Sequence, residues 1–316
     1  MNVVIFGGAG FVARHLINYY KSANDKIFLV DNSFEFTRWE EIETDVYAIR
    51  GDVRDQLTIE MNFNPDHVID TAAVHRTPGH KPHEYYLTNT LGAINISNWI
   101  RTYEINCLTV LSSISVYGSN NESVCENSEL LPNTDYGRSK LISERIYISA
   151  HDFEKSNYKL RIIRPAVIFG QGENGNFTRL AKSLNRRRFA LFGNGDLIKS
   201  SGYVKDLVRA IDFASKTSER SANINFTFPV HYSISDIVQA LCRVQSRNFP
   251  PNFDFEILNQ LIKNFPSSGI KTIERAKKLS QSLIVEPKWL KSQGFEWKFS
   301  LDEACLDWYA DVAGKF

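Results

Sequence analysis

Short apolar segments alternate with longer amphipathic segments through the first half of the chain. The short segments are rich in Val, Ile and Leu and are bounded by Gly, Asp, Asn or Pro, which is typical of buried strands. Strands are therefore predicted at Val3–Phe6, Ile27–Asp31, Val46–Arg50, His67–Ala73, Leu108–Ser113 and Leu160–Arg164. The segments between them have apolar residues three and four positions apart and predict helices at Phe11–Ala23, Pro82–Tyr103 and Tyr136–Glu154. This alternation predicts an α/β fold with a doubly wound, parallel sheet.

The pattern becomes less regular after Pro165. Glycines interrupt residues 170–175 and 193–195, and Asn248–Pro251 and Asn264–Gly269 are predicted loops. Helices are predicted at Phe177–Arg187, Lys205–Ser215, Ser233–Val244 and Leu301–Ala310. We therefore expect a sheet domain at residues 1–165 and mainly a smaller α/β lobe at residues 166–316, with room for some segments of the lobe to return to the sheet domain.

Composition and charge exclude several classes of protein. The chain has 316 residues, of which 43% are hydrophobic and 23% charged, so it is neither disordered nor a coiled coil. Its 37 basic and 36 acidic residues provide no net field for nucleic acid. Without a long apolar run or a signal peptide, we expect a cytoplasmic protein that does not insert into a membrane. The four cysteines form no C-x-x-C pair, so neither a metal site nor a disulfide framework is expected.

A glycine-rich turn, Gly7–Ala13, lies between the first predicted strand and the first predicted helix. Its G-x-x-G-x-x-A spacing suits a dinucleotide, which needs a tight turn, a close approach of the backbone and helix N–H groups directed at its pyrophosphate. Ala13 replaces the last glycine, a change that this pattern tolerates. Gly7, Gly10, Phe11 and Val12 are the residues expected to bind the dinucleotide.

Two aspartates bear on the choice of dinucleotide. Asp31 ends the second predicted strand, 21 positions after Gly10, where a carboxylate accepts hydrogen bonds from the ribose hydroxyls and repels a 2′-phosphate. NAD is therefore favoured over NADP. Asp52 follows the third predicted strand, where contact with the adenine and a plain turn aspartate explain it almost equally well.

A serine, a tyrosine and a lysine form the candidate catalytic group. Tyr136 and Lys140 are four residues apart, hence on one helix face, and they follow Ser113 at the carboxyl end of the fifth predicted strand. Use of a phenol as a base near neutral pH requires about 4 kcal/mol of stabilisation, which an ammonium about 4 Å away supplies. Lys140 is therefore predicted to lower the pKa of Tyr136, while Ser113 holds the reacting hydroxyl. The structural alternative is an exposed helix pair with a strand-end cap.

With these motifs in order, the sequence resembles an extended short-chain dehydrogenase/reductase of the nucleotide-sugar epimerase/dehydratase family. The resemblance covers nearly the whole chain and rests on Gly7–Ala13, Asp31-Asn32, Gly51-Asp52-Val53, Thr71-Ala72-Ala73, Asn89 with Gly92, Ser112–Gly118, Tyr136–Lys140 and Arg164–Gly170. It implies a Rossmann-type sheet that binds NAD and a transfer of hydride at carbon 4 of a nucleotide-linked hexose. The residues implied for NAD also include Asn32, Asp52, Val53, Ala72, Ala73, Tyr136, Lys140 and Pro165. Tyr136 is implied as base or acid, Lys140 as its tuner and ribose ligand, and Ser113 as a substrate ligand.

Departures from the family's patterns disfavour two of the activities found in the family. Ile114 and Ser115 stand where dehydratases have an acidic residue, and Ile114 stands where fucose-synthase-type enzymes have Cys, so both activities are disfavoured. Val167 occupies the usual position of a substrate-binding Asn. Lys199 lies near the usual diphosphate-binding Arg, although a surface lysine is an equal alternative. The candidate substrate ligands are Ser113, His75, Asn176 and Lys199.

The expected function is an NAD-dependent 4-epimerase of a nucleotide-linked hexose. A 4-keto-sugar reductase or 4-dehydrogenase of surface-polysaccharide biosynthesis is the alternative, and a non-catalytic NAD-binding regulator is disfavoured because Ser113, Tyr136 and Lys140 are all present. A homodimer is expected through a contact of four helices, for which Pro82–Tyr103 and Tyr136–Glu154 are the candidates. The nucleobase, the sugar and the product configuration depend on the divergent lobe.

Overall fold

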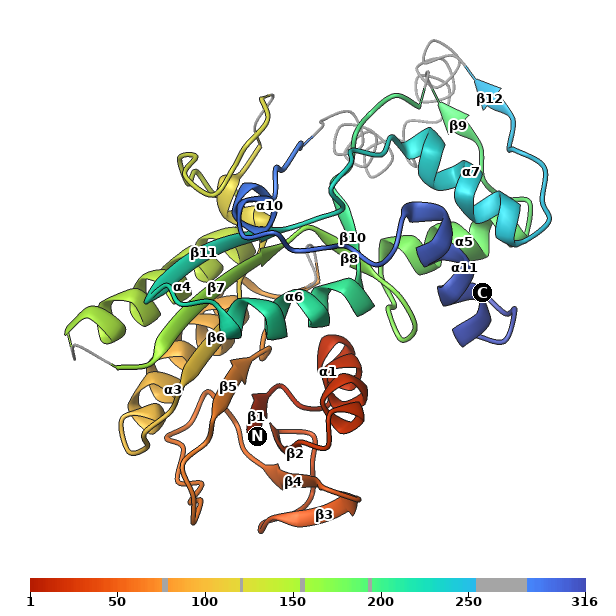
Figure 1. Cartoon of the computed structure of the whole chain (residues 1–316). Coiled ribbons are helices and arrows are strands. Elements are labelled where there is room, and N and C mark those ends of the chain that lie inside the picture. Colours follow the sequence, from red (N-terminus) through yellow and green to blue (C-terminus); the bar gives the residue numbers. More distant parts are fainter. Residues whose placement is uncertain (76–78, 120–121, 154–156, 193–194, 254–282) are drawn as a thin grey trace.

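The computed structural model describes residues 1–75, 79–119, 122–153, 157–192, 195–253 and 283–316. Its centre is an eight-stranded sheet in the order β11-β7-β6-β5-β1-β2-β4-β3 (Figure 1). The strands are β1 (Asn2–Phe6), β2 (Lys26–Asp31), β3 (Glu40–Glu43), β4 (Val46–Arg50), β5 (His67–Asp70), β6 (Cys107–Leu111), β7 (Lys159–Pro165) and β11 (Ser221–Phe226). Only β3 runs antiparallel to its neighbour in this sheet. The strand order reverses between β1 and β5, and ligands of such sheets bind at the carboxyl ends beside this point.

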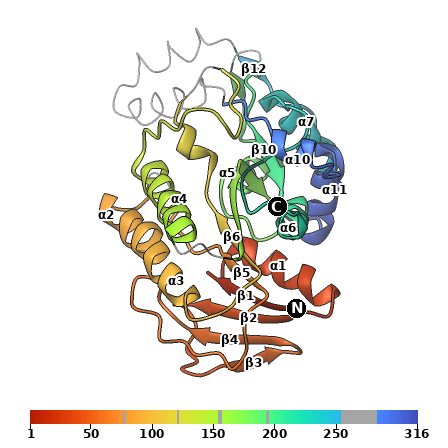
Figure 2. The same ribbon diagram turned by 60° about the vertical axis from the view of Figure 1, so that its left-hand side comes forward.

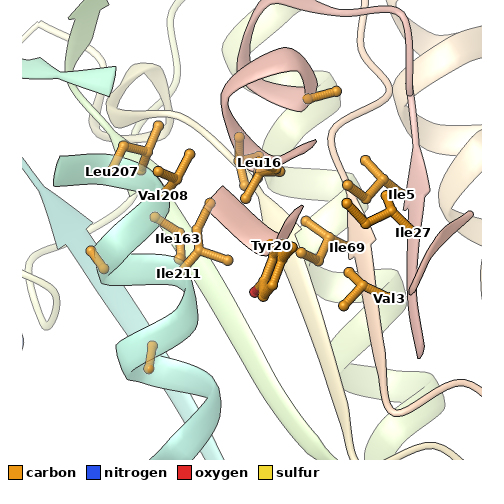
Figure 3. Close-up of a cluster of buried hydrophobic side chains, with 14 of the residues drawn as sticks. Val3, Ile5, Leu16, Tyr20, Ile27, Ile69, Ile163, Leu207, Val208 and Ile211 are labelled. Atoms are coloured by element: carbon orange, nitrogen blue, oxygen red, sulfur yellow. The ribbon is translucent and has the colours of Figure 1, made fainter. Parts of the chain in front are cut away.

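Helices cover both faces of the sheet, as the apolar strands predict. On one face, α1 (Phe11–Ser22) and α6 (Val204–Lys216) pack against alternate strand residues, including Val3 and Ile5 (Figure 3). On the other face, α3 (Gly92–Ile100) and α4 (Asp135–Phe153) pack against the intervening residues, including Val4 and Phe6. The two helical layers lie on opposite sides of the strands in Figure 2. The predicted doubly wound α/β fold is therefore confirmed.

The predicted helix Pro82–Tyr103 is divided into α2 (Pro82–Tyr85), a π-helical turn η1 (Tyr86–Leu91) and α3. Asn89 lies in the π turn and is buried. Its side chain accepts a hydrogen bond from the Val74 N–H (2.9 Å) and donates to the Val74 carbonyl (3.2 Å) and to Ser139 Oγ (2.9 Å). Asn89 thus ties the loop after β5 to α4. Wide turns of this kind are frequent at functional sites.

Two predicted strands end earlier than expected. β5 ends at Asp70 instead of Ala73, and β6 ends at Leu111 instead of Ser113, because the next residues leave the ladder and turn along the carboxyl edge. The sequence pattern also missed β11, which has a polar sequence, SANINF, and pairs with β7 at the sheet margin. An edge strand with little alternation gives no clear pattern.

The second half of the chain supplies most of a smaller lobe. Two short parallel pairs, β8 (Val167–Phe169) with β10 (Ser201–Tyr203) and β9 (Leu191–Phe192) with β12 (Asn252–Phe253), accompany its helices. The helices of the lobe are α5 (Asn176–Asn185), α7 (Ile234–Val244) and α11 (Leu301–Asp311), whereas α10 (Lys288–Ser292) packs against the core of the main sheet through Leu290. Phe169, Leu241 and Trp308 belong to one buried cluster that joins β8, α7 and α11. Thus this lobe has a core of its own.

Asn248–Pro251 is free of helix and strand, as predicted, whereas the predicted loop Asn264–Gly269 lies outside the described residues. In the described ranges, no helix combines the length and the apolar character that a membrane crossing requires.

Candidate active site

The turn between β1 and α1 packs closely against the residues after β5. The N–H groups of Gly7 and Gly8 donate to the Val30 carbonyl (2.9 and 3.1 Å). Gly7 has φ +76°, and a Cβ placed on it would lie 2.7 Å from the Ala72 nitrogen and 2.8 Å from Thr71 Oγ1. Gly10 precedes α1 and provides no side-chain cap, so the first N–H groups of this helix can meet an anion. Gly7, Gly10, Phe11 and Val12 therefore form a turn that fits a pyrophosphate.

Gly7→Ala is expected to lower the free energy of unfolding more than Gly294→Ala, which alters a glycine with the same φ angle. Gly294 also has φ +76°, but a Cβ there has no neighbour within 4 Å, so Gly294→Ala carries only the left-handed strain of about 1–2 kcal/mol. Gly7→Ala adds overlap with backbone atoms, and we expect at least about a tenfold loss of NAD affinity. Urea unfolding and calorimetric titration with NAD measure the two effects. Equal stability and affinity in both variants would contradict the packing argument.

Asp31, at the end of β2, accepts hydrogen bonds from the glycine-rich turn and from Ser33. Its Oδ2 accepts from the Ala9 N–H (3.1 Å), and its Oδ1 accepts from the N–H (2.9 Å) and the hydroxyl (2.7 Å) of Ser33. The carboxylate thus lies directly beside the glycine-rich turn. This position fits a ligand for the ribose of a dinucleotide whose pyrophosphate lies at α1.

The carboxylate of Asp52 already accepts hydrogen bonds from neighbouring side chains. Arg54 donates from Nε to both carboxylate oxygens (2.9 and 3.1 Å), and Asn32 donates to Oδ2 (3.4 Å). The hydrogen bond from the Arg54 side chain is the main reason that the pKa of Asp52 falls to about 2. These are the contacts of a turn aspartate, so contact with an adenine stays a prediction. Val53 is buried, and its side chain lies next to Gly92.

Ser113 and Tyr136 meet at the carboxyl edge of the sheet. Ser113 caps the 3-10 helix η2 (Ile114–Tyr117), where its Oγ accepts from the Ser115 N–H (3.1 Å). Tyr136 is in the first turn of α4, and the hydroxyl of Ser113 acts to lower the pKa of its phenol. Lys140 follows one turn later and is buried. The fold therefore brings the predicted serine and phenol to the same edge of the sheet, with the lysine on the same helix as the phenol.

The pKa values differ from the sequence expectation. Burial raises the pKa of Tyr136 above its usual value, although the hydrogen bond with Ser113 opposes this rise. Burial lowers the pKa of Lys140, and the charges of Asp70 and Glu144 oppose that shift. The ligand-free phenol is therefore protonated at neutral pH. Its tuning by Lys140 stays a prediction for the site with bound NAD, whose oxidised nicotinamide carries a further positive charge.

A cavity of about 220 Å³ lies beside Ser113. Its lining comes from four separate regions of the chain: Ser113, Ile114, Ser115 and Gly118 after β6, Asn133 and Thr134 before α4, Ala166 and Val167 after β7, and Leu283. Each of these side chains is small or uncharged. Sequence reasoning missed Asn133, Thr134 and Leu283, because no spacing or periodicity links loops so far apart in the chain. A cavity of this size beside Ser113 can hold the reacting part of a substrate.

The other predicted ligands lie in different environments. His75 is exposed after β5, and Asn176 is exposed in the first turn of α5, where it accepts from Arg179 (2.8 Å). Lys199 is half-buried rather than a surface lysine, and its backbone bridges to that of Leu283, a residue that lines the cavity. Pro165 ends β7, and Ala73 is half-buried after β5. Of the four candidate substrate ligands, only Ser113 is among the described residues that line the cavity.

A buried ion pair, also missed from the sequence, lies on the same face of α4. Glu144 is one turn after Lys140 and accepts from Arg164 Nε (3.0 Å) and Nη2 (2.8 Å). The hydroxyl of Ser112 also donates to Glu144. Arg164 in turn donates to the hydroxyl of Tyr117 (2.9 Å). The i, i+4 repeat from Tyr136 through Lys140 to Glu144 was a usable signal for this extension of the site.

Residues 3–227 match the model of the NAD dependent epimerase/dehydratase family. The chain belongs to this family. The predicted resemblance, the dependence on NAD and the assignment as an enzyme are thereby confirmed. The glycine-rich turn, the open start of α1 and the carboxylate of Asp31 fit the cofactor that the family name implies.

Individual members of the epimerase/dehydratase family resemble the chain along most of its length. The N-acetyl-alpha-D-glucosaminyl-diphospho-ditrans,octacis-undecaprenol 4-epimerase of Escherichia coli O157:H7 is 25% identical over 96% of this chain and 92% of its own length. The UDP-glucose 4-epimerase of Thermotoga maritima has a TM-score of 0.79 at 19% identity, with 99% of both chains covered. The UDP-glucuronic acid 4-epimerase of Bacillus cereus has a TM-score of 0.76 at 18% identity, with 100% of both chains covered. The solved structures confirm the Rossmann-type fold.

Proposed function

We propose that the chain is an NAD-dependent 4-epimerase that acts on a hexose of a nucleotide sugar. The observation that carries the proposal is that Ser113 lines a cavity together with Thr134, which directly precedes the helical turn that holds Tyr136, while Lys140 lies one turn further along α4. Gly7, Gly10 and the start of α1 would hold the pyrophosphate of NAD, and Asp31 would hold the adenosine ribose. Ala72, Ala73 and Pro165 would lie along the rest of the cofactor. When bound, NAD supplies a hydride acceptor and donor for carbon 4.

The residues of the chain supply the proton transfers and the orientation. Ser113 holds the 4-hydroxyl of the sugar toward Tyr136, which accepts the hydroxyl proton as a phenolate and returns it as a phenol after the hydride has been transferred back. Lys140 stabilises the phenolate while the proton is absent. Ile114 and Ser115 line the cavity next to Ser113, and neither has a group that can remove the proton at carbon 5. The chemistry therefore stays at carbon 4 and does not continue to dehydration.

Product analysis with and without added cofactor tests the proposal. The purified protein is incubated with UDP-glucose and, separately, with UDP-N-acetylglucosamine, and the sugar configuration is followed by proton NMR. An epimerase interconverts the 4-epimers without added nicotinamide nucleotide, because the hydride removed is returned. Formation of one NADH per 4-keto product from added NAD would instead identify a 4-dehydrogenase, the reverse reaction of a 4-keto-sugar reductase. If neither sugar gives a product, with or without added cofactor, the proposal is wrong for these sugars.

A lipid diphosphate is a second candidate for the group that carries the sugar. The undecaprenol-linked 4-epimerase named above matches 96% of this chain, and its name describes the same change at carbon 4 of a diphospho-sugar. A parallel assay with N-acetylglucosaminyl-diphospho-polyprenol in detergent separates the two carriers. Preference for the lipid-linked sugar would replace the nucleotide in the proposal and leave the roles of Ser113, Tyr136 and Lys140 unchanged.

We further propose that the protein is a homodimer joined through α3 and α4. Ile94 and Ile142 are exposed on these helices (41% and 40%), and Phe153 is exposed at the end of α4 (85%). The same residues line a hollow of about 450 Å³ between the helices. Apolar side chains gathered along two neighbouring helices suit a four-helix contact between two copies.

Ile142→Glu is expected to convert this dimer to a monomer, because it removes an apolar side chain from the contact and buries a carboxylate there. Leu306→Glu is the matched control, since Leu306 is also exposed (61%) but lies on α11 in the smaller lobe. Light scattering coupled to size-exclusion chromatography measures both masses. An unchanged dimer in the Ile142 variant, or a monomer in the wild type, would contradict the proposed interface.

We also propose that the protein is cytoplasmic and that its chain divides into two domains near residue 165. A cytoplasmic location fits the unpaired state of Cys107, Cys125, Cys242 and Cys305, because thiols stay reduced there. The division near residue 165 is supported by the separate core of the smaller lobe. α6 and β11 return to the first domain, since α6 packs on the sheet and β11 extends it.

A further inference from the structure

Ser113 lies between two side chains that reach the same buried ion pair. The hydroxyl of Ser112, the residue before it, donates to Glu144 on α4. At the end of η2, the hydroxyl of Tyr117 accepts from Arg164 Nη1 (2.9 Å). Arg164 in turn binds Glu144 through Nε (3.0 Å) and Nη2 (2.8 Å). Ser112, Glu144, Arg164 and Tyr117 thus form a closed circuit, the Glu144–Arg164 network, which the backbone through Ser113 completes.

The Glu144–Arg164 network is buried from water. Each of its four residues is at most 4% exposed. The hydroxyl of Tyr117 also donates to Asn225 Oδ1 (2.7 Å) on β11, and the guanidinium of Arg164 lies over the Tyr117 ring, 5.2 Å from its centroid. A buried polar group that loses its partner gains no water in exchange, so these bonds hold their atoms in one arrangement.

The network joins the segment that carries Ser113 to the helix that carries Tyr136. The Oγ of Ser113 accepts from the Ser115 N–H (3.1 Å) and caps η2, so its position depends on where that short helix is held. The network holds both ends of this segment, Ser112 before the cap and Tyr117 at the last residue of η2. Both ends bond to the ion pair between α4 and β7. Ser113 therefore cannot shift relative to α4 without loss of a buried hydrogen bond.

We propose that Tyr117, Arg164 and Glu144 are positioning residues, which hold the hydroxyl of Ser113 at one place relative to α4. Their importance for catalysis rests on the proposed function, in which Ser113 orients the sugar hydroxyl toward Tyr136. The placement of Ser113 itself does not depend on the identity of the substrate.

Tyr117→Phe is the direct test, because it removes the hydroxyl that closes the network and keeps the aromatic ring beneath Arg164. Tyr20→Phe is the matched control. Tyr20 is also 1% exposed, and its hydroxyl shares a hydrogen bond with Nδ1 of His67 (3.2 Å). His67 is the first residue of β5, so the control removes a buried phenol oxygen at the opposite edge of the sheet.

Hydrogen exchange of the ligand-free protein, followed by mass spectrometry, measures the placement of Ser113 without any substrate. In Tyr117→Phe we expect the amides of η2, including the Ser115 N–H, to exchange about tenfold faster, the effect of losing one hydrogen bond to a charged group. Peptides from α1 should keep their wild-type rates, and Tyr20→Phe should leave η2 unchanged. Unchanged exchange of η2, or an equal rise throughout the protein, would overturn the proposal.

Steady-state kinetics separate positioning from stability alone. Displacement of Ser113 should lower the kcat of Tyr117→Phe by about tenfold to a hundredfold, with a smaller change in KM and in NAD affinity. Ser112→Ala opens the same circuit on its other side, so the double variant should lose little more activity than Tyr117→Phe alone. Losses that multiply would show two independent contacts and contradict the circuit. Should the protein epimerise none of the sugars tested, hydrogen exchange still decides whether the network holds Ser113.

Discussion

Tyr136→Phe is expected to lower kcat by about a thousandfold, within the range of about 100 to 10,000 that general acid–base groups contribute. The substitution removes one oxygen atom, the phenol oxygen whose pKa Ser113 acts to lower. It preserves the ring, which lies 6.2 Å from that of Tyr85 between ring centroids. The loss should therefore appear in kcat, with little change in NAD affinity or in the unfolding midpoint.

Tyr86→Phe provides the matched control. The hydroxyl of Tyr86 donates to Asp135 (3.2 Å), the residue before Tyr136, so the variant also removes a phenol oxygen at the start of α4. Tyr86 is not among the described residues that line the cavity. Steady-state rates, NAD titration and urea unfolding are compared for both variants. Epimerisation by Tyr136→Phe at more than about a tenth of the wild-type rate would exclude the phenol as the acid–base group.

The sequence predicted the parts of the site that follow strand ends. Gly7 follows β1, Asp31 ends β2 and Ser113 lies two residues after β6, and a parallel sheet brings such strand ends to one edge. Tyr136 and Lys140 were predicted because their four-residue spacing places them on one helix face. All five lie at that edge or on α4 in the structure.

Contacts between distant loops could not be predicted in this way. Leu283 lines the cavity with Ser113 although 170 residues separate them, and no local pattern records that contact. The direction of the Tyr136 pKa shift also depended on tertiary packing, since burial outweighs the hydrogen bond with Ser113. A spacing of four residues places Lys140 near Tyr136, but it does not show that Asp70 and Glu144 act on the ammonium.

Arg164→Met is expected to lower the free energy of unfolding by about 3–5 kcal/mol, the usual cost of leaving one partner of a buried ion pair alone. The side chains of Arg164 and Glu144 are 3% and 2% exposed, and their closest atoms are 2.8 Å apart. Burial opposes the charge of Arg164, but the hydrogen bonds and charge of Glu144 raise its pKa overall. Without Arg164, the carboxylate of Glu144 keeps only the hydroxyl of Ser112 among the side-chain donors in the described ranges.

An exposed pair provides the comparison that makes this prediction specific. Arg243 and Asp302 are joined by two hydrogen bonds (3.0 and 2.9 Å), yet their side chains are 58% and 60% exposed. Arg243→Met should therefore cost less than about 1 kcal/mol, because water solvates the carboxylate that remains. The double variant Glu144→Met with Arg164→Met removes both buried charges and should be more stable than Arg164→Met alone. Urea unfolding gives all four free energies. A double variant as unstable as the sum of its single variants would show that lost packing, rather than an unpaired buried charge, is the cause.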